Sequence, residues 1–177
     1  MKTKVQNGAT NVGLFLAHAL ALENEAAERY DELADSMEAH NNVEVAKLFR
    51  DLAGYSKKHA EEVRQIAAEH APLPKVAPWE FQWDATKESP EAAAFESAHY
   101  LMKPHHALKM ALISENQGNK YYASVAAETK DPEVARLARE FADEEAGHVT
   151  LVRQWLERYP APKDGWDDDP DPPNISD

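Results

Sequence analysis

Four long stretches of the chain repeat apolar residues at the spacing of an amphipathic α-helix, and this pattern restricts the fold more than any other. The stretches cover about residues 11–39, 43–70, 104–129 and 132–159. Short connections separate the first stretch from the second and the third from the fourth. Long helices joined in this way lie antiparallel to each other. The sequence therefore predicts an all-α protein built from two helical hairpins.

The segment between the two hairpins differs in composition from the rest of the chain. Residues 71–90 contain four prolines, with Trp79, Phe81 and Trp83 among them. Because proline interrupts a helix interior, we expect an extended crossover here. Ser89-Pro90 is typical of a helix start and predicts a short helix inside this crossover, which spans residues 71–103.

The ends of the predicted helices carry recognisable residues. The Asn41-Asn42 pair is expected to end the first helix and to cap the second. Asp131-Pro132-Glu133 predicts the start of the last helix. After Pro160 the chain contains one lysine and six aspartates between prolines, so we expect an acidic, flexible tail over residues 160–177. The bundle is expected to span residues 11–159 as one domain.

The charge and composition exclude several kinds of partner and site. With 19 basic and 32 acidic residues the formal net charge is −13, which argues against binding to nucleic acid or an anionic membrane. No apolar run approaches the roughly 18 residues of a membrane span, and the N-terminus lacks a signal-peptide pattern, so we expect a cytoplasmic protein. The chain has no cysteine, which excludes disulfides and thiolate metal sites. A metal here would need carboxylate and imidazole ligands, which suit iron, manganese or zinc.

Two polar residues interrupt the apolar stripe of the last helix. Glu145 and His148 are three residues apart, so they lie on one helical face. That face also carries Leu137, Phe141 and Val152. Burying a carboxylate and an imidazole in such a stripe costs several kcal/mol unless a partner compensates them. A bound metal ion is one such partner, and a hydrogen-bonded polar pair is the other.

The two hairpins resemble each other, and the resemblance pairs the polar residues. At a shift of 92 positions Glu23 matches Glu115, and each glutamate precedes a tyrosine by two helical turns. The second helices align with His59 opposite His148. Each hairpin thus offers one glutamate and one histidine. The matching tyrosines are Tyr30 and Tyr122, and we expect their hydroxyls to support the carboxylates.

These residues resemble those of the rubrerythrin and ferritin-like superfamily over residues 12–157. The resemblance implies a ferritin-like antiparallel four-helix bundle with a long crossover between its second and third helices. It also implies a di-iron carboxylate site, with oxidase, peroxidase or ferroxidase-type activity that uses O₂ or peroxide. A homodimer is expected from the same resemblance. The implied metal ligands are Glu23, His59, Glu115, Glu145 and His148.

The chain departs from the family pattern in two respects. Ser56 stands where the family has a bridging glutamate, three residues before His59, and a serine hydroxyl is neutral and too short to bridge two cations. Glu62 and Glu144 are candidates to replace it, although neither lies at the expected level. The cysteine-ligated electron-transfer module of rubrerythrins is also absent, so a peroxidase of this type needs an unknown external electron donor.

Two interpretations follow. In the first, Glu115, Glu145 and His148 hold one iron ion, while Glu23 and His59 hold a second one more weakly. In the second, the bundle has lost its metal and serves as a structural or interaction module, and its buried glutamates form hydrogen bonds with the two tyrosines and two histidines. Ser56 is the main support for the second interpretation.

Overall fold

The computed structural model describes residues 12–70, 72–75 and 99–167, and these form the predicted bundle. Its long helices are α1 (Val12–Ala39), α2 (Val43–Ala67), α4 (Pro104–Glu128) and α5 (Pro132–Arg158). A short 3₁₀ turn, η2 (Ala68–His70), continues α2. Each long helix agrees with its predicted range to within three residues. The helix predicted at Ser89-Pro90 and most of the crossover lie outside the described residues.

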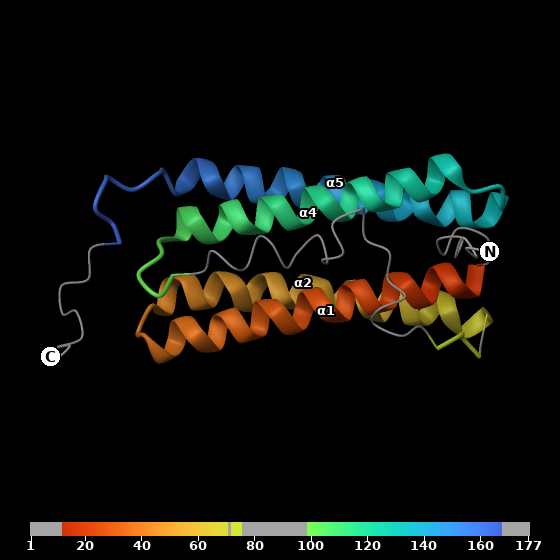
Figure 1. Ribbon diagram of the computed structural model, residues 1–177, viewed down its shortest axis with the longest axis horizontal. Coiled ribbons are helices and arrows are strands. Elements are labelled where there is room, and N and C mark those ends of the chain that lie inside the picture. The colour runs from red at the N-terminus through yellow and green to blue at the C-terminus, as the bar shows by residue number, and fades with distance from the viewer. Residues whose placement is uncertain (1–11, 71, 76–98, 168–177) are drawn as a thin grey trace, which may run out of the picture.

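The helices form two layers, with α1 and α2 in one and α4 and α5 in the other (Figure 1). Contacts are most extensive within each hairpin, while α2 meets α4 and α1 meets α5 between the layers. This arrangement confirms the all-α, ferritin-like bundle. No helix in the described ranges combines the length and the apolarity needed to cross a membrane.

The apolar interior is divided into two clusters by a polar layer. One cluster contains Tyr30, Phe49 and Leu108, which are fully buried. The other contains Phe15 and Tyr122, whose ring centroids lie 6.1 Å apart in an edge-to-face contact. Along each long helix the residues of one cluster precede those of the other. The position between the two clusters is therefore the middle of the bundle.

Of the two predicted helix caps, the structure confirms the one at the start of α5 and not the one at the start of α2. Asp131 caps α5 as predicted, because its side chain accepts hydrogen bonds from the backbone N–H groups of Glu133 and Val134 at 2.9 and 3.2 Å. The prediction that Asn42 caps α2 was wrong. Its side-chain amide instead donates to the carbonyl oxygen of Met102 at 2.6 Å, just before α4 begins. Asn41 takes the left-handed backbone conformation that the tight turn requires.

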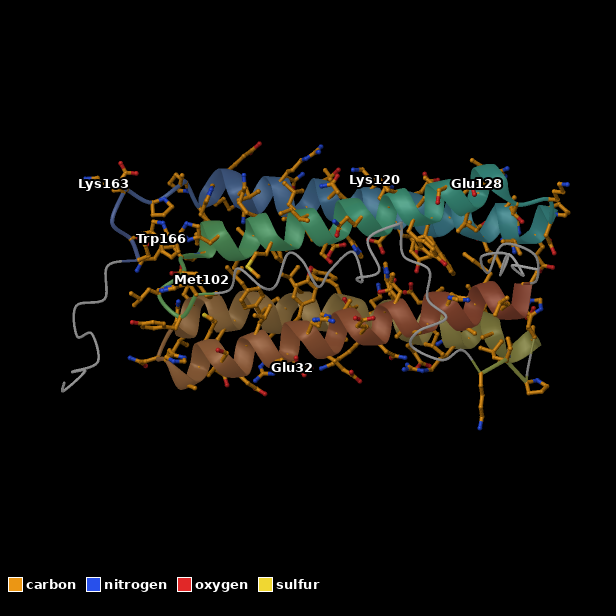
Figure 2. The ribbon with its side chains drawn as sticks, viewed as in Figure 1. Glu32, Met102, Lys120, Glu128, Lys163 and Trp166 are labelled. Atoms are coloured by element: carbon orange, nitrogen blue, oxygen red, sulfur yellow. The ribbon has the colours of Figure 1, made fainter. Side chains whose placement is uncertain are left out.

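Part of the predicted tail packs against the bundle. The indole ring of Trp166 lies 3.9 Å from the imidazole of His106, measured between ring centroids, and packs on the apolar cluster beside Met102 (Figure 2). We expected no ordered packing after Pro160, and for residues 160–167 this expectation needs correction. The partly buried side chain of Trp166 gives this segment an apolar contact that its acidic, proline-containing composition otherwise lacks. Residues 168–177 lie outside the described part of the chain.

Candidate metal centre

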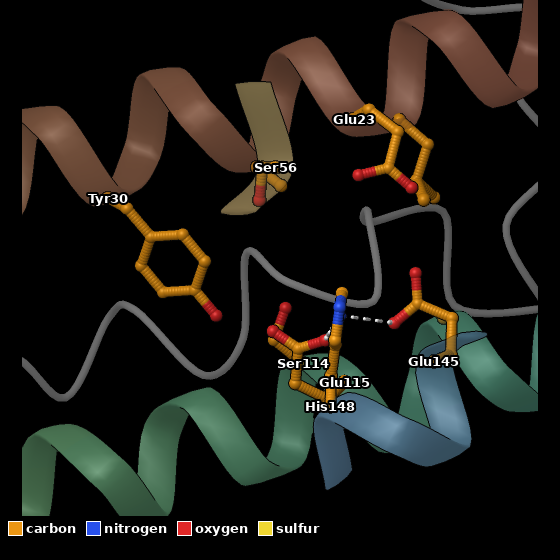
Figure 3. Close-up of a pocket in the computed structure, with 10 residues that line it drawn as sticks. Glu23, Tyr30, Ser56, Ser114, Glu115, Glu145 and His148 are labelled. Atoms are coloured by element: carbon orange, nitrogen blue, oxygen red, sulfur yellow. Dashed lines mark hydrogen bonds and ion pairs between the residues drawn. The ribbon is translucent and has the colours of Figure 1, made fainter. Parts of the chain in front are cut away.

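The polar layer in the middle of the bundle receives one buried polar side chain from each long helix (Figure 3). The helices α1, α2, α4 and α5 contribute Glu23, Ser56, Ser114 and Glu145, in that order. The two glutamates are each only 5 % exposed. Carboxylates are almost never buried to this extent without a partner that balances their charge. The layer therefore marks a place where chemistry, rather than packing, determines the residues.

All five residues predicted as metal ligands meet at this layer. His59, Glu145 and His148 each offer a ligand atom, and these atoms lie within 4.8 Å of one another. The two imidazole rings come from different hairpins and stack with their centroids 4.5 Å apart. Each of the other two residues contacts a histidine of its own hairpin, since Glu115 Oε2 lies 3.2 Å from His148 Nδ1 and Glu23 Oε1 lies 3.8 Å from His59 Nδ1.

Charged groups at the site change the pKa of their neighbours. Burial by itself would lower the pKa of His59, but the nearby carboxylates of Glu23, Glu144 and Glu62 outweigh it and raise this pKa above its ordinary value. Burial, followed by the charges of Glu23 and Glu145, raises the pKa of Tyr122. The Tyr122 hydroxyl is thus neutral and donates a hydrogen bond to Glu23 Oε1 at 3.4 Å. The raised pKa of His59 indicates an excess of negative charge around its ring.

A metal ion fits this set of donors. Three carboxylates with low solvent exposure surround two imidazoles, and a positive charge among them offsets the cost of burying the carboxylates. The backbone also makes room for one ligand. A Cβ atom at Gly118 would lie 3.3 Å from Glu145 Oε2, so the glycine leaves space for this carboxylate in the interior. The mixed oxygen and nitrogen donors suit iron, manganese or zinc.

Comparison with known proteins identifies the family. The family model described as Rubrerythrin matches residues 15–101 and 106–169. The chain belongs to the rubrerythrin family. Among solved structures it is similar to an uncharacterized conserved protein from Magnetospirillum magnetotacticum, at 47 % sequence identity and a TM-score of 0.67. The match covers 86 % of this chain and 98 % of that one. None of the curated proteins compared matches the chain.

Ser56, where the sequence predicts that a bridging carboxylate is missing, lies in the polar layer. The serine side chain faces a cavity of about 10 Å³ that is also lined by Glu23, Glu115 and Glu145. This volume is close to that of one water-sized sphere. Ser56 is buried, whereas the neighbouring Tyr55 is 39 % exposed.

Some residues of the rubrerythrin site were not singled out from the sequence. Gly118 follows Glu115 by three residues inside a helix, and a helical glycine is itself a signal of close approach. Ser114 carried no such signal. A second group of donors also emerged, in which ligand atoms of His59, Glu62 and Glu144 lie within 4.8 Å of one another. The sequence had suggested these two glutamates only as replacements for the missing bridge.

Gly118→Ala should weaken metal binding while it changes stability little. In an unhindered helix the substitution adds up to about 1 kcal/mol of stability, but here the new methyl group must displace the Glu145 carboxylate. We expect roughly a tenfold loss of affinity for Fe²⁺ in anaerobic titration, by analogy with the loss of groups that position metal ligands. Gly54→Ala is the matched control, because nothing lies within 4 Å of its added Cβ. Equal affinities in the two variants would contradict this role for Gly118.

Proposed function

We propose that this chain is an iron-binding member of the rubrerythrin family with oxidase or peroxidase-type activity. The observation that supports this most directly is the convergence of Glu23 and Glu145, both nearly inaccessible to solvent, with the stacked rings of His59 and His148. Glu115 completes the donor set through its contact with His148. Iron bound here would supply redox chemistry toward dioxygen or hydrogen peroxide.

The protein residues contribute orientation and exclusion of water. Glu115 accepts a hydrogen bond from His148 in the present arrangement, and Tyr122 donates one to Glu23, so two of the carboxylates have defined orientations. The apolar clusters on both sides of the layer close off the interior along the bundle axis. Such fixed surroundings maintain ligand geometry and limit the access of solvent to the site.

Turnover needs electrons from a separate donor. None of the 177 residues is a cysteine, so this chain has no thiolate to hold an iron–sulfur centre. We therefore propose that a separate redox protein or small reductant serves this site. We also propose a homodimer, for which light scattering should give twice the mass of the 19.8 kDa chain. A particle of cage size would contradict the dimer.

Iron should raise the melting temperature of the protein. A ligand that binds only the folded state at 100 times its Kd adds about 2.7 kcal/mol, which corresponds to a shift of roughly 5–10 °C for a chain of this length. Calorimetry of the EDTA-treated protein, with and without Fe²⁺ under anaerobic conditions, measures this shift. Elemental analysis of protein purified from iron-supplemented medium provides the stoichiometry. Identical melting curves together with metal-free protein would favour the structural bundle that has lost its metal.

A further inference from the structure

Compared with His148, His59 lacks a glutamate three residues before it and has two additional carboxylates nearby, those of Glu62 and Glu144. A shift of 89 positions superimposes His59 on His148 and relates α2 to α5. Under this shift Ser56 corresponds to Glu145, so the bridging carboxylate is missing at position 56 and present at position 145. The same shift relates Glu62 to Leu151 and Glu144 to Tyr55. The extra carboxylates therefore occur only beside the histidine whose own helix lacks the glutamate.

We propose that His59, Glu62 and Glu144 form a second divalent-cation site, displaced outward from the bridging position that Ser56 cannot fill. The proposal refines the proposed function, since it assigns the second ion of this rubrerythrin-family chain to ligands outside the shared layer. The first ion stays with Glu115, Glu145 and His148. The two ions would then share no carboxylate ligand.

The orientation of the His59 ring supports this assignment. Its Nε2 atom lies 3.9 Å from Glu144 Oε2 and faces the outer carboxylates, while Nδ1 faces Glu23 Oε1 at 3.8 Å. Histidines that bind metals commonly direct their other ring nitrogen toward a carboxylate, which fixes the ring orientation and makes the ligating nitrogen more basic. Glu23 is placed to do this for a cation at Nε2.

The structure also provides space for the cation. A cavity of about 30 Å³ is lined by His59, Glu62 and Glu144, by Glu23 and Glu145 on its inner side, and by apolar side chains that include Phe141 and Val63. This cavity is larger than the one beside Ser56. Its apolar walls strengthen the attraction between a cation and the carboxylates, because they lower the local dielectric constant.

The equivalent outer position, beside His148, lacks both carboxylates, because Leu151 and Tyr55 stand in place of Glu62 and Glu144. There the Tyr55 ring stands beside His148, with their centroids 5.8 Å apart, and contacts Trp155 on the same helix as the histidine. On the His59 side one positive group competes with the ion, since Lys58 Nζ lies 3.6 Å from Glu62 Oε1. Lys58 is mostly exposed, and exposed ion pairs of this kind are weak. A divalent cation would replace it.

Titration of the full chain with Mn²⁺, followed by electron paramagnetic resonance of the free ion, tests the assignment. Wild-type protein should bind one ion tightly and a second more weakly. The double variant Glu62→Gln/Glu144→Gln should weaken the second event at least tenfold and leave the first unchanged. Glu61→Gln is the matched control, because Glu61 neighbours Glu62 but pairs with the exposed Arg64. Anomalous scattering from Mn²⁺-soaked crystals should place the weaker ion at His59 Nε2.

The other outcomes separate this proposal from the proposed function. If the double variant keeps both binding events, or if the second anomalous peak lies between Ser56 and Glu145, the outer site is wrong. If wild-type protein binds a single ion that Glu145→Gln removes, the proposed function holds and the outer site is again wrong. Absence of any bound ion in the wild-type protein would overturn both. Circular dichroism of each variant shows that a lost binding event does not come from unfolding.

Discussion

Replacing Glu145 with glutamine should abolish tight iron binding and leave the protein folded. The glutamine has nearly the same shape, but it cannot supply the negative charge that lies within ligand distance of both His59 and His148. The loss of affinity should be at least about 100-fold, since removing groups that only orient a metal ligand already costs up to that much. Anaerobic Fe²⁺ titration with elemental analysis measures the loss.

Although it binds iron less tightly, the metal-free Glu145→Gln protein should be at least as stable as the metal-free wild-type protein. Removal of one buried carboxylate relieves its repulsion with Glu23 and Glu115, so the melting temperature in EDTA should stay the same or rise. Glu140→Gln is a suitable control on the same helix, because Glu140 is exposed and pairs with Arg136. If Glu145→Gln binds iron as tightly as wild-type protein does, the layer is not the metal site.

Ser56→Glu should raise the number of tightly bound irons from one to two. The new carboxylate would lie three residues before His59, which is the spacing of Glu145 and His148. Its negative charge would reduce the repulsion between two cations at the separation of roughly 3.5–4 Å that is typical of two-metal sites. With the bridge restored, the second ion would bind beside the first, and Glu62→Gln/Glu144→Gln would then have little effect on the count.

The same substitution should destabilise the metal-free protein. The cavity beside Ser56 measures about 10 Å³, so the longer side chain must push its neighbours apart. Such overpacking typically costs about 1–3 kcal/mol, and another buried negative charge adds to this cost. The melting temperature should therefore fall in EDTA and rise in iron by more than that of wild-type protein. An unchanged iron count in a folded Ser56→Glu protein would show that the missing carboxylate does not limit the second ion.

Periodic patterns in the sequence were sufficient to predict the four helices and the five converging side chains. Each hairpin repeats the order of glutamate, tyrosine and histidine, and helical spacing places each glutamate and its tyrosine on one face of their helix. The Asp131 cap was also predictable, because a capping side chain bonds to backbone groups two or three residues away. Features with partners close in the sequence could be predicted for this reason.

The features that could not be predicted involve partners that are distant in the sequence. Asn42 is a residue type typical of a helix cap, yet its amide reaches the carbonyl oxygen of Met102, 60 residues away. The outer group of His59, Glu62 and Glu144 likewise joins two helices from different hairpins. No pattern within one helix contains this information.

The ligands proposed for the outer ion have a consequence for how the two hairpins stay together. His59 and Glu62 lie on α2, whereas Glu144 lies on α5, so this set joins the two hairpins. The contacts between the described helices are also much less extensive across the two layers than within each hairpin. An ion bound by these three residues would thus connect the two hairpins, and its binding energy would be expressed mainly as resistance to their separation.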